Sequence, residues 1–472
     1  MFSMDKKTRD ILLGPIVFAV MAFALNGVFS FKAAVAMALT VWMGLWWILR
    51  PVDIAVTSFL PIVVNAVFDL IPASQIISQY FSEIVVLLVG SDILSLTWTN
   101  TGLDKRLAVK ALCFIGTDIK QQIIVWLCAS TLLSTVLPNV VVAMIMLPIA
   151  AAMLKFSGLG EHLLMKVAVP IYLAIAWGSG VGGFGSPIGS SANLTAVAYL
   201  EGITGHEFMY IDWMGRFIPF LLLVLLLNMF FLVFIPTPIK KLSDTKEYFS
   251  KLNAEFGAMT KGEWIGMILF SFATVAAFAR PLFADWFPAL RPAYVFFCCG
   301  MLCFVLKDEK GNMMVQWKQV EKELMWGMFF LFAGGLALGR LVTQTGAAAR
   351  LAELITALPL TGGIETMGIF VAFTTFLAEI SSNTASASIS IPVVQSISQQ
   401  LGLNPIPYVL ITIVAFNCAY ILPVSTRAIP VSYGLDPGAM FKYGLGLCFA
   451  NIVMTTVVGY LVVKFIPIFY TI

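Results

Sequence analysis

Long apolar runs, separated by short polar segments, fill most of the sequence. A run of about 20 mostly apolar residues is long enough to cross a bilayer as an α-helix. The pattern therefore predicts an all-α polytopic membrane protein with about eleven transmembrane helices. The predicted spans cover residues 11–29, 32–49, 53–71, 83–102, 165–200, 213–235, 262–280, 292–306, 325–345, 404–434 and 439–466.

Two further apolar stretches, at 122–156 and 361–401, are too long for one helix and are interrupted near the middle. Pro138-Asn139 breaks the first stretch, and Ser381-Ser382-Asn383-Thr384 breaks the second. Each stretch is predicted to form a re-entrant helical hairpin. Two of the predicted spans are also interrupted, at 182–193 and at 423–430.

The composition excludes several classes of protein. Charged residues make up 11% of the 472 residues, hydrophobic residues make up 60%, and the net charge is +3. These values exclude a soluble globular enzyme, a disordered chain and a nucleic-acid binder. The two histidines, His162 and His206, lie far apart, so neither an enzyme site nor a metal site is expected. No span carries the long polar stripe that a channel would need.

Basic residues indicate the orientation, because lysine and arginine concentrate in cytoplasmic loops. Lys6, Lys7 and Arg9 place the N-terminus in the cytoplasm. If the two hairpins do not cross the bilayer, the richest basic segments also lie inside and the C-terminus lies outside. The sequence is thus predicted to be a multi-pass protein of the plasma (inner) membrane. The basic segments fall within 105–120, 240–261 and 307–322.

The strongest signal is an internal repeat. Thr101-Gly102, followed by Arg106-Leu107-Ala108, resembles Thr345-Gly346, followed by Arg350-Leu351-Ala352, at an offset of 244 residues. Asn139 and Asn383 share this offset, and so do Pro148 and Pro392. Further along, Ser186-Pro187 pairs with Leu422-Pro423 at an offset of 236, so eight residues were lost between the motifs. Arg106 and Arg350 are interpreted as interfacial anchors.

The predicted orientation makes the two repeats inverted, since the span ending at Thr101 runs inward and the span ending at Thr345 runs outward. Inverted repeats indicate a carrier whose site lies near the bilayer midplane. The predicted parts are an N-terminal segment with the first span at 1–31, a first repeat at 32–240, a cytoplasmic loop at 241–261 and a second repeat at 262–472.

The four interruptions supply the candidate chemistry. Unwound backbone at membrane depth occurs only where it is buried in protein or lines a cavity. A helix N-terminus just past each hairpin break presents free N–H groups that attract anions. The breaks at 182–193 and 423–430 leave free carbonyl groups that suit small cations. Together these features predict a cavity for a small anion.

On these motifs the sequence resembles the divalent anion/sodium symporter family, the INDY-type di- and tricarboxylate carriers, with the exchanger branch of that family as one alternative. The resemblance implies a homodimer with a scaffold domain and a mobile transport domain, and an elevator-like motion. It implies a C4–C6 carboxylate substrate and no cofactor other than sodium ions. The implied substrate-binding residues are Asn139, Val140, Ser190, Ser382, Asn383, Thr384, Thr426 and Arg427. The implied cation-binding residues are Ser134, Pro138, Asn139, Gly189, Ser382, Asn383 and Ser425.

Some positions depart from the family pattern. Pro138 and Val140 replace two hydroxyl residues at the first hairpin tip, and the repeat mate of Ser134 is Ala378. An arginine, Arg427, has entered the second break. If Arg427 faces the site, it can hold a substrate carboxylate or replace a sodium ion, and an arginine uncovered in an empty carrier would favour obligate exchange over sodium symport.

Other ionisable residues within the apolar runs leave alternatives open. Glu379, four residues before Asn383, could pair with Arg427 and leave a structural ion pair, or it could carry a proton. Asp92 and Arg340 also lie inside spans, and we interpret them as helix-packing or vestibule groups.

Overall fold

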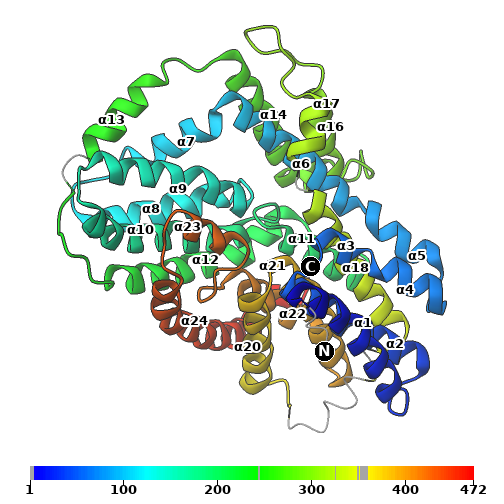
Figure 1. Cartoon of the computed structure of the whole chain (residues 1–472). Helices are drawn as coiled ribbons and strands as arrows, with labels where there is room; N and C mark the ends of the chain where they lie inside the picture. Colours follow the sequence, from blue (N-terminus) through cyan, green and yellow to red (C-terminus); the bar gives the residue numbers. More distant parts are fainter. Residues whose placement is uncertain (1–4, 243–244, 325, 348–349, 351–359, 472) are drawn as a thin grey trace.

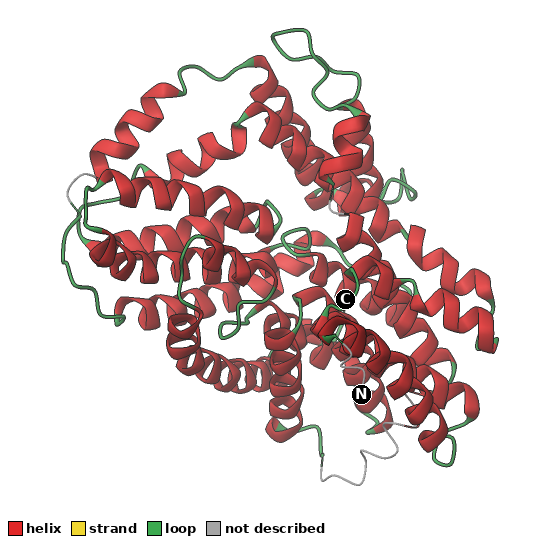
Figure 2. Cartoon of the chain, viewed as in Figure 1, coloured by secondary structure: helices red, strands yellow, loops and turns green. Residues whose placement is uncertain are grey.

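The computed structural model describes residues 5–242, 245–324, 326–347, 350 and 360–471. This part of the chain is built from helices and connecting loops, with no strand (Figures 1 and 2). The only bridges of β type in these ranges are isolated pairs between Asp118 and Lys241 and between Lys307 and Met313. Leu351 and Ala352 of the repeat motif lie outside the described residues.

Within the described ranges, eight helices are long and apolar enough to cross a membrane. The polytopic helical fold is therefore confirmed. Two of the eight join neighbouring elements, over Ala73–Thr101 (α5, η1 and α6) and Glu161–Gly185 (α10 and η2). The others are α1 (Lys6–Leu25), α9 (Asn139–Phe156), α12 (Tyr210–Val233), α14 (Lys261–Phe278), α18 (Trp326–Gln344) and α24 (Pro437–Phe465).

Several predicted spans are shorter or more broken than the sequence pattern indicates. The run 53–71 forms two helices, α3 (Ile54–Ser58) and α4 (Leu60–Phe68), with Pro61 in the first turn of α4. Proline has no N–H to donate to the preceding turn, so a new helix begins there. The run 292–306 forms only the eleven residues of α16 (Pro292–Leu302). Apolar composition alone does not show where such a run is divided.

Helix–break–helix units occupy both predicted hairpin positions. The first consists of α8 (Ile119–Ser134) and α9, and the second of α20 (Ile364–Ile380) and α21 (Asn383–Gln400). The second arms begin at Asn139 and Asn383, so both start at the same position of the repeat. Each hairpin is followed by an interrupted helix. These interrupted helices are α10 (Glu161–Gly182) with α11 (Ser191–Thr204), and α22 (Pro405–Asn417) with η3 (Ser425–Ala428) and α23 (Ile429–Ser432).

The packing repeats as well. In the first half α10 packs against α8 and α9, and in the second half α22 packs against α20 and α21. The two halves also contact each other. Helix α21 of the second half packs against α11 of the first, and α9 of the first half packs against η3 and α23 of the second. Figure 1 shows α8, α9 and α10 side by side, with α20 and α24 below them. Each hairpin therefore contacts the interrupted helix of the opposite half.

The segment predicted as a polar loop, 241–261, contains a helix, α13 (Thr245–Glu255). Arg106, expected to be an interfacial anchor, is only 4% exposed and holds the end of this segment. Its Nε is 2.6 Å from a Glu263 carboxylate oxygen. Its other nitrogens donate to the carbonyl groups of residues 256–258. The remaining elements are α2 (Phe31–Leu49), α5 (Ala73–Ile77), η1 (Ser78–Phe81), α6 (Glu83–Thr101), α7 (Leu103–Leu112), η2 (Gly183–Gly185), α15 (Arg280–Phe283), α17 (Trp317–Glu323) and η4 (Pro467–Phe469).

Candidate functional site

The tip of the second hairpin carries the most complete set of donors. Ser382 caps α21, its Oγ accepting the N–H of Ala385 at 3.1 Å. The hydroxyl groups of Thr384 and Ser191 share a hydrogen bond of 2.8 Å, which joins this tip to the start of α11 in the other half. Within the described residues the half-buried side-chain amide of Asn383 has no hydrogen-bond partner. An amide and a helix N-terminus thus stand together where a carboxylate can be bound.

The first tip offers fewer donors. Pro138 precedes α9 and gives it no side-chain cap, and the Oδ1 of Asn139 accepts the N–H of Val140 at 2.9 Å. All three residues are half-buried. The free N-terminus of α9 remains, but the hydroxyl groups present at the second tip are missing here. The two tips are therefore chemically unequal.

Backbone oxygens gather around Gly189 in the first interrupted helix. A side chain on Gly189 would lie 2.5 Å from the carbonyl oxygen of Gly183 and 2.6 Å from that of Ser134. The hydroxyl group of Ser134 donates to the carbonyl of Ser179 at 2.7 Å. Ser190, 4% exposed, caps α11 without a side-chain hydrogen bond. Only glycine allows the backbone to approach these carbonyl groups so closely.

Two asparagines connect the interrupted helices: Asn193, the last residue of the break at 182–193, and Asn417, which the sequence analysis did not single out. The Nδ2 of Asn417 donates to the Oδ1 of Asn193 at 2.8 Å, and Asn193 itself donates to the carbonyls of Gly183 and Ser186. Both asparagines are buried, and the Oδ1 of Asn417 has no hydrogen-bond partner. A lone asparagine at the end of the apolar run 405–417 is the signal that could have identified Asn417.

Arg427 is buried in the second break, away from solvent. Its Nε donates to the carbonyl of Leu422 at 2.7 Å, and its Nη2 donates to the carbonyls of Ala378 and Glu379 at 3.0 and 3.2 Å. The same Nη2 lies 3.7 Å from the Glu379 carboxylate. The ion pair with Glu379 is present, so the uncovered arginine assumed for obligate exchange is not what the structure shows. The guanidinium thus donates hydrogen bonds to backbone carbonyl groups that could otherwise coordinate a bound cation.

Glu379 is held by three backbone donors as well as by the arginine. Its Oε1 accepts the N–H of Tyr420 at 2.6 Å, and its Oε2 accepts those of Ile421 and Leu422 at 2.9 and 3.2 Å. The Glu379 carboxylate, which belongs to α20, therefore accepts hydrogen bonds from the unwound backbone after α22. Thr426 is buried beside Arg427, and Ser425 has a φ of 57°, a left-handed conformation that costs a serine about 1 kcal/mol.

The oxygen atoms in the two halves can be compared as ligands for a hard cation such as sodium, which prefers neutral and anionic oxygens. In the first half the carbonyls of Ser134 and Gly183 and the unpartnered Oδ1 of Asn417 fit such an ion. In the second half Arg427 donates to the carbonyl of Ala378, the repeat mate of Ser134, and to those of Glu379 and Leu422, so a second ion does not fit. Within the described residues there is also no cluster of three or more His, Cys, Asp or Glu side chains for a metal ion.

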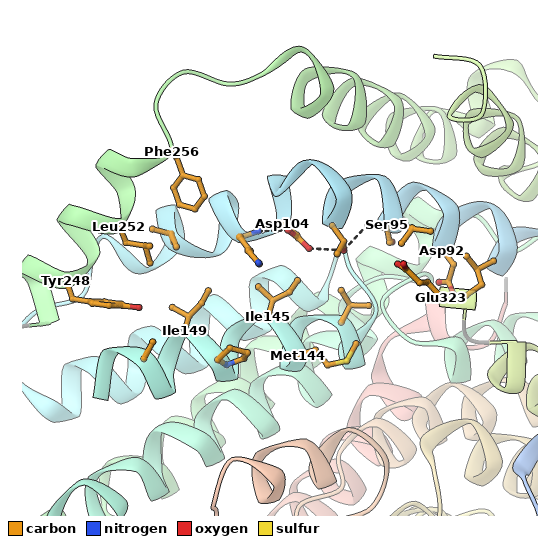
Figure 3. A pocket seen from close by; sticks show the side chains of 18 residues that line it. Asp92, Ser95, Asp104, Met144, Ile145, Ile149, Tyr248, Leu252, Phe256 and Glu323 are labelled. Atoms are coloured by element: carbon orange, nitrogen blue, oxygen red, sulfur yellow. Dashed lines mark hydrogen bonds between the residues drawn. The ribbon is translucent and has the colours of Figure 1, made fainter. Parts of the chain in front are cut away.

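A cavity of about 590 Å³ opens beside the first hairpin. It separates α9 from α6 and is covered by α13. Figure 3 shows Asp92 and Ser95 on the α6 side, with Met144, Ile145 and Ile149 on the α9 side. In the second half, by contrast, α21 packs directly against α18. Equivalent helices are thus apart in one half and in contact in the other.

A repeated unit of hairpin and interrupted helix in a polytopic helical protein is typical of a transporter, and the similar proteins indicate a transporter rather than an enzyme. The family model described as "Citrate transporter" matches residues 44–413 and 300–472, and the chain belongs to this family. The resemblance to divalent anion/sodium symporters is thereby confirmed.

The similar proteins agree with that family. The chain is 26% identical over 472 residues to the sodium-dependent dicarboxylate transporter SdcS of Staphylococcus saprophyticus, covering 96% of this chain and 91% of that one. It is 27% identical to SdcS of Staphylococcus aureus strain MSSA476, covering 92% and 88%.

Two solved structures share the fold. The YdaH transporter of Alcanivorax borkumensis has a TM-score of 0.56 at 15% identity, covering 84% of this chain and 88% of that one. MtrF of Neisseria gonorrhoeae, described with a class of antimetabolite efflux pumps, has a TM-score of 0.51 at 13% identity, covering 82% and 83%.

Proposed function

We propose that this membrane transporter carries C4–C6 di- and tricarboxylates, such as succinate, malate, 2-oxoglutarate or citrate, between the two hairpin tips. The observation that supports this most is the hydrogen bond between Thr384 and Ser191, which brings the second tip against the interrupted helix of the other half. Asn383, Thr384 and the α21 N-terminus would bind one carboxylate. Asn139, Val140 and the α9 N-terminus, with Ser190 and Thr426 nearby in the breaks, would receive the other end of the substrate.

We propose an elevator-like motion, which the unequal packing of the halves supports. The cavity beside α9 is lined by α13 and by Lys105, which belong to the basic segments predicted to be cytoplasmic. We infer that the transport domain, formed by the hairpins and interrupted helices, lies in its inward-facing position. Movement outward would close the α6–α9 gap and separate α21 from α18. The chain would act as a homodimer in the plasma membrane with a cytoplasmic N-terminus, as its family resemblance implies.

Exchange is the mode of transport that Arg427 supports. The guanidinium is covalently part of the carrier, so it cannot be released with the substrate as a sodium ion can. A carrier with a tethered cation at this position draws no energy from a sodium gradient there. If no ion binds at the remaining position in the first half, the gradient of a second carboxylate drives transport.

Sodium-coupled symport is the second candidate, favoured by the oxygen atoms around Gly189. The carbonyls of Ser134 and Gly183, with the Oδ1 of Asn417, could bind a single ion. The relatives named sodium-dependent dicarboxylate transporters agree with this alternative. It differs from exchange by needing an external ion and no internal substrate.

The test is uptake of labelled dicarboxylate by sealed proteoliposomes. Exchange predicts uptake that requires a carboxylate inside and is indifferent to sodium. Symport predicts uptake that requires external sodium and proceeds into vesicles without internal substrate. Liposomes containing Asn383→Ala protein serve as the matched control for specific uptake. If the wild-type protein takes up none of the four carboxylates under either condition, the proposed function is wrong.

A further inference from the structure

The large cavity has a smaller counterpart beside the second hairpin. A cavity of about 170 Å³ lies between α11, α18 and α21. Four of its lining residues on α18 are each 244 positions after a lining residue of the large cavity on α6. The pairs are Asp92 with Leu336, Ser95 with Gly339, Leu96 with Arg340, and Thr99 with Thr343. The inverted repeat therefore builds the same vestibule wall twice, once on each side.

The two walls differ in charge at these matched positions. The large cavity has Asp92 where the small one has Leu336, and the small cavity has Arg340 where the large one has Leu96. The large cavity is also lined by Asp104, Lys105 and Glu323, which leaves an excess of acidic groups. Among the described residues, Arg340 is the only charged one that lines the small cavity.

Arg340 is exposed and available to an anion. Within the described residues it has neither a hydrogen bond nor an ion pair, unlike Arg427, Arg106 and Arg291. Two buried polar atoms in the same cavity, the Oη of Tyr199 and the Oε1 of Gln395, also have no hydrogen-bond partner. A phenolic O–H and an arginine together are a suitable pair of donors for a carboxylate.

Nearby acidic groups do not cancel this charge, because they have arginine partners of their own. Arg291 lies 2.5 Å from Glu83 and 2.8 Å from Glu201, and Arg280 lies 3.1 Å from Glu207. These three glutamates line the adjoining polar cavity rather than the cavity that contains Arg340.

We propose that Arg340 and Tyr199 form an outer anion-binding site, where a carboxylate substrate first contacts the carrier before it reaches the hairpin tips. Asp92 is the opposite element on the inner wall, where an acidic group rather than a cation lies beside the departing anion. The inference rests on the proposed transport function and on the predicted orientation. The inference implies that the apparent affinity of the carrier for its carboxylate substrate differs between the two sides of the membrane.

The repeat itself supplies the test variants, because each charged residue can be replaced by the leucine of its counterpart wall. Arg340→Leu and Asp92→Leu are assayed in right-side-out and inside-out membrane vesicles, with the KM for succinate measured on each side. Arg340→Lys keeps the charge and controls for loss of packing. Lys464→Leu removes another exposed cation predicted to lie on the outer face and controls for general surface charge.

Arg340→Leu is expected to raise the KM in right-side-out vesicles by about threefold to tenfold, an effect that weakens at high ionic strength, and to leave the KM in inside-out vesicles nearly unchanged. Asp92→Leu should lower the KM only in inside-out vesicles. Arg340→Lys and Lys464→Leu should match the wild-type protein. The proposal would be overturned if Arg340→Leu changed the KM equally on both sides or did not change it at all. Transport by the wild-type protein would still support the proposed function in that case.

Discussion

Arg427 supplies a positive charge that the chain itself holds in the second break. Three carbonyl groups and the Glu379 carboxylate surround its guanidinium. A sodium ion would require the same kind of oxygens. The side chain and the ion are thus alternatives for one position.

Replacing Arg427 with alanine should therefore open a cation position next to Glu379. We expect Arg427→Ala to be nearly inactive without sodium and to gain at least about fivefold in uptake when sodium is added, because the ion then supplies the missing charge. Arg427→Lys, which keeps a charge, is the control. Uptake by Arg427→Ala at the wild-type rate without sodium would remove Arg427 from the mechanism.

Thr384 and Ser191 allow a second test of single residues. Thr384→Val removes the hydroxyl group and nearly preserves the shape of the side chain, so it should weaken substrate binding by about tenfold through the loss of one buried hydrogen bond. Isothermal calorimetry on detergent-purified protein measures this change. Thr204→Val, at the outer end of α11, is the matched control. Unchanged affinity in Thr384→Val would displace the site from this tip.

The sequence predicted Ser382, Asn383 and Thr384 as site residues because the motif is short and local. It left the orientation of Arg427 open, because the three carbonyls and Glu379 meet the guanidinium only when α20 packs on α22. Asn417 was missed for the same reason, since its partner, Asn193, is 224 positions away.

At the scale of elements, the contact between α18 and α21 depends on glycine. A side chain on Gly335 would lie 2.0 Å from the Oγ of Ser388 and 2.5 Å from its Cβ. On the same helix, Gly339 faces the hydroxyl group of Tyr199. These glycines let the hairpin and the interrupted helix lie close to α18.

Gly335→Ala should push α21 away from α18 and destabilise the inward-facing position. We expect uptake to fall by at least about fivefold, with the reduction in maximal rate rather than in KM, because the position of the transport domain changes and not the hairpin tip. Gly215→Ala, where the added methyl group meets nothing within 4 Å, is the control. Equal rates for the two variants would contradict the assigned contact.

The hairpins and breaks could be predicted from the sequence because each lies at a repeated position and each contains a polar or proline interruption. The number of continuous helices could not. Pro61 divides one predicted span, and α13 forms within a segment predicted as a loop, because local turn and capping preferences are weaker signals than apolar length.

At the scale of the whole molecule, the proposed inward-facing arrangement predicts which positions reagents can reach. In a cysteine-depleted background, Met144→Cys lines the large cavity and should react with a membrane-impermeant thiol reagent only from the cytoplasmic face. Ser388→Cys, packed against Gly335, should react slowly from either face. Labelling of Met144→Cys from the outer face alone would reverse the assigned orientation.

The two halves are not interchangeable, because α11 runs for 14 residues while its counterpart beyond the break, α23, has only four. In the described part of the chain α11 lines the small cavity, whereas the large cavity is covered by α13, which has 11 residues. The inward and outward arrangements must therefore differ in free energy even without a ligand. An unloaded carrier would therefore face one compartment for most of the time. The concentration of the anion in that compartment then sets how often a transport cycle begins.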